Sequence, residues 1–248
     1  MNHDPDWIVP EWPAPANIRA LITTRSGGVS SGPYASFNLG LQAGDDPQAV
    51  TQNRAQLRRL LPQDPRWLRQ AHGSVVVDAD ELNAPPDADA SVARLPDTVC
   101  AIMIADCMPV LLCDEGGTLV AAAHAGWRGL AGGVIENTVT RLVAAGAMPD
   151  TLLAYLGPAI GPTAFEVGAD VYEAFVGRDP LAAQAFTPQR SGKWLACLFT
   201  LAQLALRRAG VSRVYGGGLC TYSDSRRFFS YRRDQTTGRM AALIWRER

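Results

Sequence analysis

The chain has 248 residues, of which 47% are hydrophobic and 19% charged, a composition that is typical of a globular protein and excludes collagen, coiled coils and disordered chains. Its 23 basic and 24 acidic residues give a net charge of -1, so bulk charge draws it neither to nucleic acids nor to anionic membranes. No apolar run approaches the roughly 18 to 20 residues of a membrane-spanning helix, and the first residues lack the parts of a signal peptide, so we expect a cytoplasmic protein with no nucleic-acid or membrane partner.

The N-terminal part alternates short apolar runs with turn-forming segments. Asp46 and Pro47 are typical of an N-cap and a first helical residue, and the apolar stripe that follows them stops at Pro62. In chain order we expect a strand at 18–24, a loop at 26–33, this helix, a strand at 74–77 and a loop at 81–90.

The rest of the chain predicts further strands and two amphipathic helices. We expect strands at 99–105, 110–113, 118–123 and 152–156, helices at 132–145 and 194–209, and strands at 213–215, 228–231 and 241–245. Hairpins mixed with helices favour a layered α/β or α+β fold with mixed sheets. Because no repeat, linker or leftover amphipathic surface is present, we expect one domain over residues 1–248 and a monomer.

A hairpin in the centre of the chain places a cysteine near a histidine. If residues 114–117 close this hairpin, Cys113 faces Thr118 and Cys107 faces His124. Directly opposed residues have Cβ atoms about 4.5 to 5.5 Å apart, so a thiolate and an imidazole could bind one ion or share a proton. A slip of one residue would place the two side chains on opposite faces of the sheet.

Only one set of two histidines and a cysteine is available for a metal. The chain has 3 histidines, and because we expect His3 to lie in a mobile terminus, the set is His72, Cys107 and His124. Three protein ligands leave a position open, which is the arrangement of a catalytic zinc that lowers the pKa of bound water to about 7. The competing interpretation, which the spacing alone favours, treats Cys107 as a small buried hydrophobe and each histidine as a core residue.

The other cysteines predict no disulfide framework. The total of 5 cysteines is odd and contains no CxxC pair. We interpret Cys100, Cys113 and Cys197 as core residues because they lie on apolar strands or a helix. Cys220 follows three glycines that indicate a close approach of the backbone to another segment.

Six segments together resemble the YfiH, or laccase-domain, family. They are TRSGGVS at 24–30, FNLG at 37–40, QAHG at 70–73, ADCMPV at 105–110, HAGWRG at 124–129 and FSYRRD at 229–234. The resemblance implies a four-layer α/β/β/α sandwich and a metal, usually zinc, held by His72, Cys107 and His124. It also implies purine nucleoside chemistry: phosphorolysis of adenosine, inosine, guanosine and methylthioadenosine, and deamination of adenosine.

The family also carries an older label, multicopper polyphenol oxidase, and one bacterial branch is linked to editing of peptidoglycan precursors. Two usable histidines are too few for a multicopper laccase site, although a thiolate and imidazoles suit a single copper as well as zinc. Deamination of adenosine is consistent with the predicted site, because it needs a metal with an open position and a nearby proton carrier.

Phosphorolysis also needs a phosphate-binding group. Arg25, beside two glycines, and Arg128, just before a helix N-terminus, are the candidates. Arg25 could instead cap a loop, and Arg128 could pair with a surface carboxylate. Asn38 and Ser230 are candidates for contacts to the ribose or base, but turn chemistry explains both equally well.

Two neighbouring sequence features have simpler interpretations. Asp106 follows a strand and precedes Cys107, and adjacent strand residues point to opposite faces, so we do not choose it as the general base. The run 231–234 is typical of a solvated edge strand with an ion pair.

Two other classes of function stay open. In a metal-free hydrolase or amidase, Cys107 would be the nucleophile and His124 its base, and the family's fold is shared with cysteine-dependent deamidating toxins. In a binding protein that acts, for example, on a cell-wall enzyme, the same residues would form a structural metal clip.

Overall fold

The computed structural model describes residues 6–248, so His3 lies outside the described part of the chain. A six-stranded sheet has the order β11 (Arg213–Gly216), β7 (Leu152–Leu156), β5 (Met108–Asp114), β6 (Val120–Ala125), β3 (Ala90–Ala93) and β2 (Val76–Asp78). A three-stranded sheet has the order β1 (Ile18–Ile22), β12 (Met240–Arg246) and β4 (Cys100–Ile104). A smaller sheet joins β8 (Glu166–Val167), β10 (Trp194–Ala196) and β9 (Phe186–Pro188).

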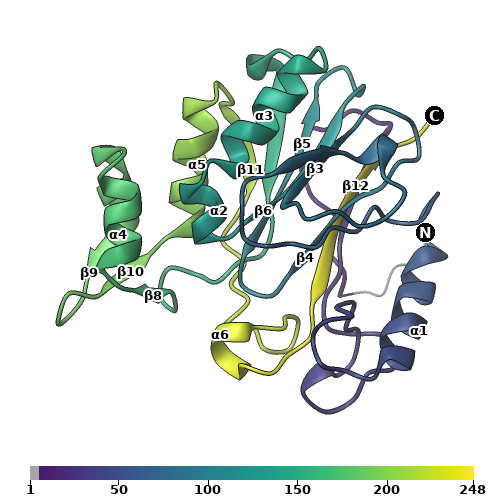
Figure 1. The fold of residues 1–248 in the computed structure, drawn as a ribbon, viewed down its shortest axis with the longest axis horizontal. Helices are drawn as coiled ribbons and strands as arrows, with labels where there is room; N and C mark the ends of the chain where they lie inside the picture. The colour runs from purple at the N-terminus through teal and green to yellow at the C-terminus, as the bar shows by residue number, and fades with distance from the viewer. Residues whose placement is uncertain (1–5) are drawn as a thin grey trace.

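Helices border these sheets on both sides (Figure 1). They are α1 (Pro47–Arg58), α2 (Trp127–Ala131), α3 (Val134–Ala144), α4 (Ala169–Val176), α5 (Leu198–Arg208) and α6 (Tyr231–Asp234). Short 3-10 turns lie at Gly32–Tyr34, Ala79–Glu81, Pro149–Thr151 and Pro180–Ala185. Within residues 6–248 no helix combines the length and the apolar character that a membrane crossing requires.

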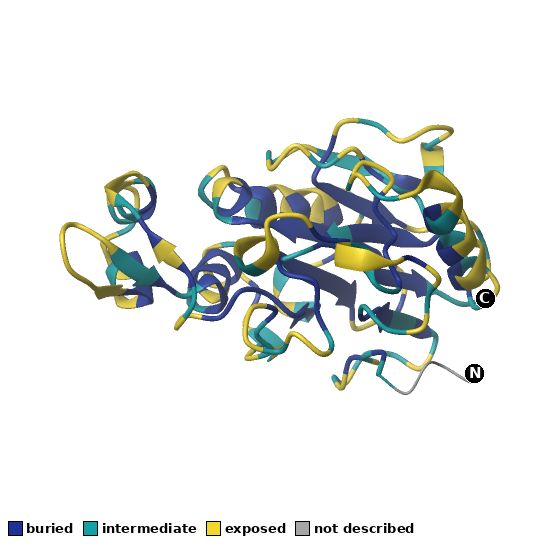
Figure 2. Cartoon of the chain, turned by 90° about the horizontal axis from the view of Figure 1, so that it is seen from below, coloured by how far each residue is buried: buried dark blue, intermediate teal, exposed yellow. Residues whose placement is uncertain are grey.

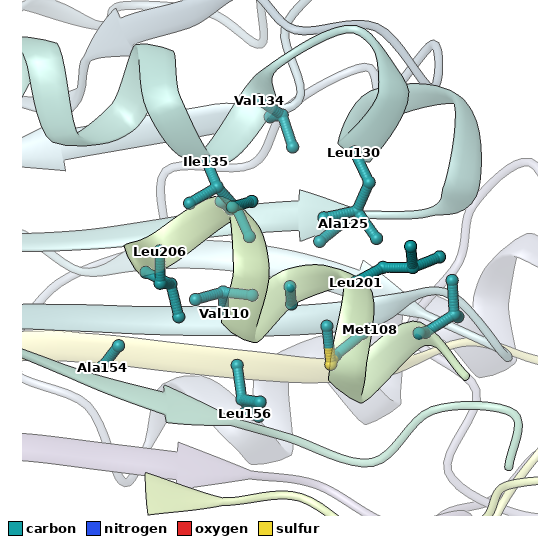
Figure 3. Packing of buried hydrophobic residues seen from close by; sticks show 14 of the residues in the cluster. Met108, Val110, Ala125, Leu130, Val134, Ile135, Ala154, Leu156, Leu201 and Leu206 are labelled. Atoms are coloured by element: carbon teal, nitrogen blue, oxygen red, sulfur yellow. The ribbon is translucent and has the colours of Figure 1, made fainter. Parts of the chain in front are cut away.

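The central strands of the six-stranded sheet, β3, β5, β6 and β7, are buried on both faces because most of their residues are apolar. Successive residues of β5 alternate between two cores: Val110 and Leu112 pack in one, Leu111 and Cys113 in the other. On the first face they meet α3 and α5, as the labelled side chains of Figure 3 show. Figure 2 shows the central strands in dark blue, with the exposed residues at the periphery.

The three-stranded sheet is also covered on both faces. Ile102 and Ile244 point into the core shared with the six-stranded sheet. Leu21 and Leu243 point the other way and pack against Leu57 of α1. The order of layers is therefore helices, sheet, sheet and helix, which confirms the mixed-sheet α/β/β/α sandwich.

The register of the central hairpin differs from the prediction by two residues. Cys113 lies opposite Val120, not Thr118, and His124 lies opposite Pro109, not Cys107. The turn is longer than expected because Asp114 caps it, with one carboxylate oxygen accepting from the backbone N–H groups of residues 118 and 119 at 2.8 and 2.7 Å. A shift of two residues preserves the face on which each strand residue lies.

Several other predicted elements differ in the structure. The predicted helix at 132–145 is α3, which begins two residues later than expected because its N-cap, Gly133, takes a left-handed conformation (φ 86), whereas the short helix α2 before it was not predicted. The predicted helix at 194–209 begins as β10, and its helical part starts only after Cys197. The strand β3 was not predicted, and its first residue, Ala90, falls in the predicted loop 81–90.

The predicted strand at 228–231 is also wrong. Phe228 and Phe229 are fully buried, and their aromatic character suggested a strand. Ser230 instead caps α6, its hydroxyl accepting from the backbone N–H of Arg233 at 3.2 Å. The run 231–234 is consequently a helical turn and not an edge strand.

Candidate metal centre

Three side chains that are far apart in the sequence converge at one end of the six-stranded sheet. His72, Cys107 and His124 each offer a ligand atom, and these atoms all lie within 4.8 Å of one another. The two imidazole rings meet edge to face, with centroids 4.9 Å apart. The structure therefore brings together all three residues that the sequence analysis selected.

Each of the three residues is placed by a different kind of local structure. His124 lies on β6 and is buried, with 4% of its surface exposed. Cys107 immediately precedes β5 and follows Asp106, whose φ of 92 turns the chain sharply. His72 is exposed, in a loop before β2, and adopts a left-handed φ of 61. The group thus has a buried wall and an open side.

A buried carboxylate that the sequence analysis missed connects both histidines. Asp89, with 1% of its surface exposed, accepts from His124 Nδ1 at 2.9 Å. It also accepts from three consecutive backbone N–H groups, those of Ala71, His72 and Gly73, at 3.2, 2.9 and 2.6 Å. Because Nδ1 of His124 is engaged, its Nε2 is left for a ligand. Asp89 lies in the predicted loop 81–90, and the residues around it form no motif that would have identified it as part of the site.

Glycines of the HAGWRG segment make room for this group. A Cβ at Gly126 would lie 2.7 Å from Cys107 Sγ and 3.5 Å from His72 Cδ2. A Cβ at Gly129 would lie 2.9 Å from the carbonyl oxygen of Gly73. The contacts of 2.7 and 2.9 Å are too close for a real Cβ, so both positions need glycine.

The charges of the group support one another. Burial raises the pKa of the Cys107 thiol, but the charge and hydrogen bonds of His124 and His72 outweigh it and bring the pKa down to about 6. Burial lowers the pKa of His124, and the Cys107 thiolate and Asp89 outweigh it and raise the pKa to about 9. Without a metal, the centre is a thiolate beside an imidazolium.

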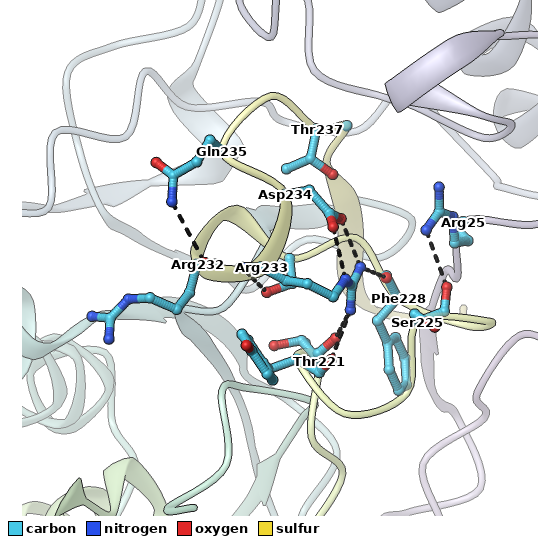
Figure 4. A network of polar contacts seen from close by, with 12 residues as sticks. Arg25, Thr221, Ser225, Phe228, Arg232, Arg233, Asp234, Gln235 and Thr237 are labelled. Carbon is cyan, nitrogen blue, oxygen red and sulfur yellow. Dashed lines mark hydrogen bonds and ion pairs between the residues drawn. The ribbon is translucent and has the colours of Figure 1, made fainter. Parts of the chain in front are cut away.

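The two predicted phosphate-binding arginines lie in different settings. Arg25 donates from Nε to the carbonyl of Ala35 at 2.9 Å and from Nη1 to that of Ser225 at 3.0 Å, so it holds two loops together (Figure 4). Arg128 is exposed and its guanidinium lies 4.3 Å from the centroid of the Trp127 ring. Among residues 6–248, no carboxylate forms an ion pair with Arg128, so the predicted surface pair is not formed there.

The two predicted ribose or base contacts are buried in the scaffold. Asn38 Oδ1 accepts from the backbone N–H groups of Gly40 and Arg239 at 2.9 and 2.8 Å, and Nδ2 donates to Asp45 at 3.0 Å. Ser230 caps α6 and has no exposed surface. The structure favours the turn roles that the sequence left open for both residues.

The segment after β11 is fastened to the strand end that carries Cys107. Asp106 accepts from the Thr221 hydroxyl and from the backbone N–H of Arg232, both at 2.6 Å. Arg233 forms the predicted ion pair with Asp234 at 2.7 Å. Its guanidinium also donates to the carbonyls of Thr221, Tyr222 and Phe228 (Figure 4). Asp106 therefore joins the start of β5 to α6 and to the loop at Thr221.

The remaining cysteines are free thiols. Burial raises the pKa of both Cys100 and Cys113 to about 12, in keeping with their predicted core positions. Cys197 is half-buried at the start of α5. Cys220 Sγ accepts from the backbone N–H of Gly161 at 3.2 Å, which is the close backbone approach expected at this position.

Comparison with known sequences identifies relatives over nearly the whole chain. Residues 19–247 match the family described as multi-copper polyphenol oxidoreductase laccase. Purine nucleoside phosphorylase PA4543 of Pseudomonas aeruginosa is 53% identical over 240 residues, which cover 96% of this chain and 98% of the relative. Purine nucleoside phosphorylase YfiH of Escherichia coli strain K12 is 52% identical over 241 residues, with the same coverage.

Solved structures share the same architecture. The crystal structure of NMB0706 from Neisseria meningitidis, of the DUF152 family, is 54% identical with a TM-score of 0.94, covering 98% of this chain and 100% of that one. YlmD from Geobacillus stearothermophilus is 31% identical with a TM-score of 0.93, covering 100% of this chain and 98% of that one. On the family match, the identities and the shared architecture, this chain belongs to the laccase-like YfiH family.

Proposed function

We propose that this protein is a zinc-dependent purine nucleoside enzyme. It would catalyse phosphorolysis of adenosine, inosine, guanosine and methylthioadenosine, and deamination of adenosine. The observation that carries the proposal is the convergence of His72, Cys107 and His124 at one site. Relatives that are about half identical and carry the name purine nucleoside phosphorylase support the substrate class.

The donor set fits a zinc ion. One thiolate and two imidazoles are ligand types that zinc prefers, and their atoms lie within 4.8 Å of one another. Asp89 supplies the carboxylate partner that histidine ligands of zinc commonly have. When bound, the metal would supply a Lewis acid with an open coordination position.

The side chains of the centre have separable tasks in such an enzyme. Asp89 keeps the proton of His124 on Nδ1, so that Nε2 presents a lone pair to the site. His72 lies on the open side, where a nucleoside could enter. In phosphorolysis a phosphate oxygen bonds to ribose C1′ while the glycosidic bond breaks, its electron pair leaving with the base, which takes up a proton. In deamination, water adds oxygen at purine C6 and ammonia leaves.

Copper is a second candidate for the metal, because thiolate and imidazole ligands suit it as well. A single three-residue group in residues 6–248 does not supply the many histidines of a multicopper oxidase. Metal analysis of the protein purified without added metal would distinguish the two ions. A zinc content near one per chain is expected, and stoichiometric copper would contradict the proposal.

A metal-free Cys-His hydrolase or amidase, acting for example on a peptidoglycan precursor, is the second candidate function. The thiolate of Cys107 beside the imidazolium of His124 favours it, because this pair is an activated nucleophile and its proton carrier. His72 would be dispensable in that mechanism. A His72→Ala variant with full activity and no bound metal would therefore support the hydrolase and overturn the zinc enzyme. The third candidate function is a binding protein in which the same three residues hold a structural metal ion.

The test of the proposed function is a product assay with adenosine, with and without phosphate. Adenine formed only with phosphate would establish phosphorolysis, and inosine formed without phosphate would establish deamination. Cys107→Ala is the control and should form neither product. Absence of all products from zinc-loaded protein would overturn the proposed function. The single domain, the monomeric state and the cytoplasmic location stay predictions of the sequence.

A further inference from the structure

Arg239 lies beside the strand end that carries Cys107. It directly precedes β12, in which Met240 is opposite Ile104 of β4. The antiparallel register therefore continues with Arg239 opposite residue 105, next to Asp106 and Cys107. In Figure 1 the start of β12 lies beside α6, the helical turn that Asp106 holds.

The chain holds the Arg239 side chain in place. Its Nη1 donates to the carbonyls of Thr237 and Gly238 at 2.9 and 3.0 Å, and its guanidinium faces the Tyr231 ring at 5.9 Å. Gly40 leaves the space that the stem occupies, since a Cβ there would lie 2.7 Å from Arg239 Cγ. A side chain fixed in this way loses little conformational freedom when it binds a ligand.

The Arg239 guanidinium has no counter-charge in ion-pair contact within residues 6–248. Nearby Arg233 and Arg227, in contrast, pair with Asp234 and Asp224 at 2.7 and 2.6 Å. Burial lowers the pKa of Arg239, and the charges of Cys107 and Asp106 only partly offset this. A half-buried cation without an ion-pair partner gains free energy from an anionic ligand.

The N–H groups of Arg239 that have no acceptor within the described residues lie along one edge of its guanidinium. Nη1 is engaged with carbonyls, whereas Nε and Nη2 donate to no acceptor in the described part of the chain. These two N–H groups are parallel, and their spacing matches two oxygens of a phosphate. Of the earlier candidates, Arg25 already donates from Nε to the carbonyl of Ala35, and Arg128 is exposed.

We propose that the Nε and Nη2 edge of Arg239 binds the inorganic phosphate that attacks the nucleoside. The inference rests on the proposed function and adds the subsite for its second substrate. Arg239 would neutralise the oxyanion and orient one phosphate oxygen toward ribose C1′; the bond to C1′ forms from that oxygen, and the electron pair of the glycosidic bond leaves with the base. The arginine itself transfers no proton.

Steady-state kinetics of phosphorolysis test this subsite. In Arg239→Gln the KM for phosphate should rise about 10-fold to 100-fold, the usual loss for a charge-assisted bidentate contact, while the KM for the nucleoside changes little. Arg239→Lys keeps the charge but loses the fork, so its KM should lie between those of Arg239→Gln and the original protein. Arg141→Gln, at an exposed position on α3, is the matched control and should change neither constant.

Calorimetric titration of the zinc-loaded protein with inorganic phosphate separates this inference from the proposed function. Weaker phosphate binding in Arg239→Gln, with binding retained in Arg141→Gln, would support the subsite even if no nucleoside is turned over. Unchanged binding in Arg239→Gln, or weaker binding only in Arg128→Gln, would overturn it even in an active phosphorylase. If Arg239→Gln does not fold, the same comparison is made with Arg239→Lys, whose unchanged phosphate binding would overturn the fork.

Discussion

Asp89 is the residue on which the geometry of both histidines depends. Its carboxylate receives four N–H groups, one from the His124 ring and three from the loop that carries His72. An Asp89→Asn substitution keeps the shape, but it removes the charge and turns one acceptor into a donor. We expect zinc affinity to fall about 10-fold to 100-fold and the free energy of unfolding to fall by about 3 kcal/mol.

Chelator competition and urea unfolding measure these two effects. Asp87→Asn is the matched control, because Asp87 is exposed and pairs only with Arg69 on the surface. It should leave zinc affinity unchanged. Equal zinc affinity in Asp89→Asn and the original protein would contradict the orienting role.

The thiol of Cys107 should be more reactive than those of Cys100 and Cys113, which lie on the strands β4 and β5. Its pKa of about 6 makes it a thiolate at neutral pH, whereas Cys100 and Cys113, with a pKa of about 12, stay protonated. In metal-free protein, iodoacetamide should therefore modify Cys107 before Cys100 and Cys113, and the rate should fall as the pH drops below about 6. Peptide mass spectrometry over a pH series measures this, and added zinc should protect the thiol. A rate that rises only near about pH 8.5, as for an ordinary thiol, would contradict the pKa.

At the scale of elements, the segment 221–234 depends on one internal arginine. Arg233 donates to the carbonyls of Thr221, Tyr222 and Phe228, and these acceptors would lose their partner in Arg233→Gln. We expect the free energy of unfolding to fall by about 2 to 3 kcal/mol in urea titrations. Arg226→Gln, at an exposed position in the same segment, should change it by less than about 0.5 kcal/mol. Equal effects of the two substitutions would show that the segment is held by other contacts.

In the central hairpin, the side chain of Asp114 fixes the length of the turn and therefore the register of the two strands. A four-residue turn and one with Asp114 as its cap are equally compatible with the apolar pattern of the two strands. The carboxylate of Asp114 selects the longer turn because it satisfies the N–H groups of Thr118 and Leu119. His124 consequently lies opposite Pro109, and Cys107 reaches the site from beyond the strand end.

At the scale of the molecule, the metal should stabilise a fold that already exists without it. The sheets and helices enclose large apolar cores that do not involve the metal centre. Zinc at about 100 times its Kd should add about 2.7 kcal/mol and raise the Tm by about 5 to 10 °C. Differential scanning calorimetry with zinc and then with a chelator measures this, and Cys107→Ala should show no shift. Complete unfolding on chelation would instead favour a structural metal clip.

Local chemistry made most of the fold predictable. The helix that starts at Pro47 was predicted from its cap and its stop, and both strands of the central hairpin from uninterrupted apolar runs. The short helix α2 was not predicted, because its five residues are too few to show an apolar stripe. Likewise, Phe228 and Phe229 have strand propensity, but burial between layers fixes their conformation.

By itself, the sequence determined the candidate ligands, because a chain with so few histidines and one suitable cysteine allows a single His-Cys-His set, and it determined the family through short motifs. Only the tertiary structure decided what surrounds that set. Asp89 and Arg239 carry no local signal. The partners of Asp89 lie 16 to 35 residues away, and the backbone of Arg239 is held by Asn38, 201 residues away, across loops and sheets whose register depends on the packing of whole layers. Long-range placement of a charged group is a property of packing, and packing is complete only when all four layers are assembled.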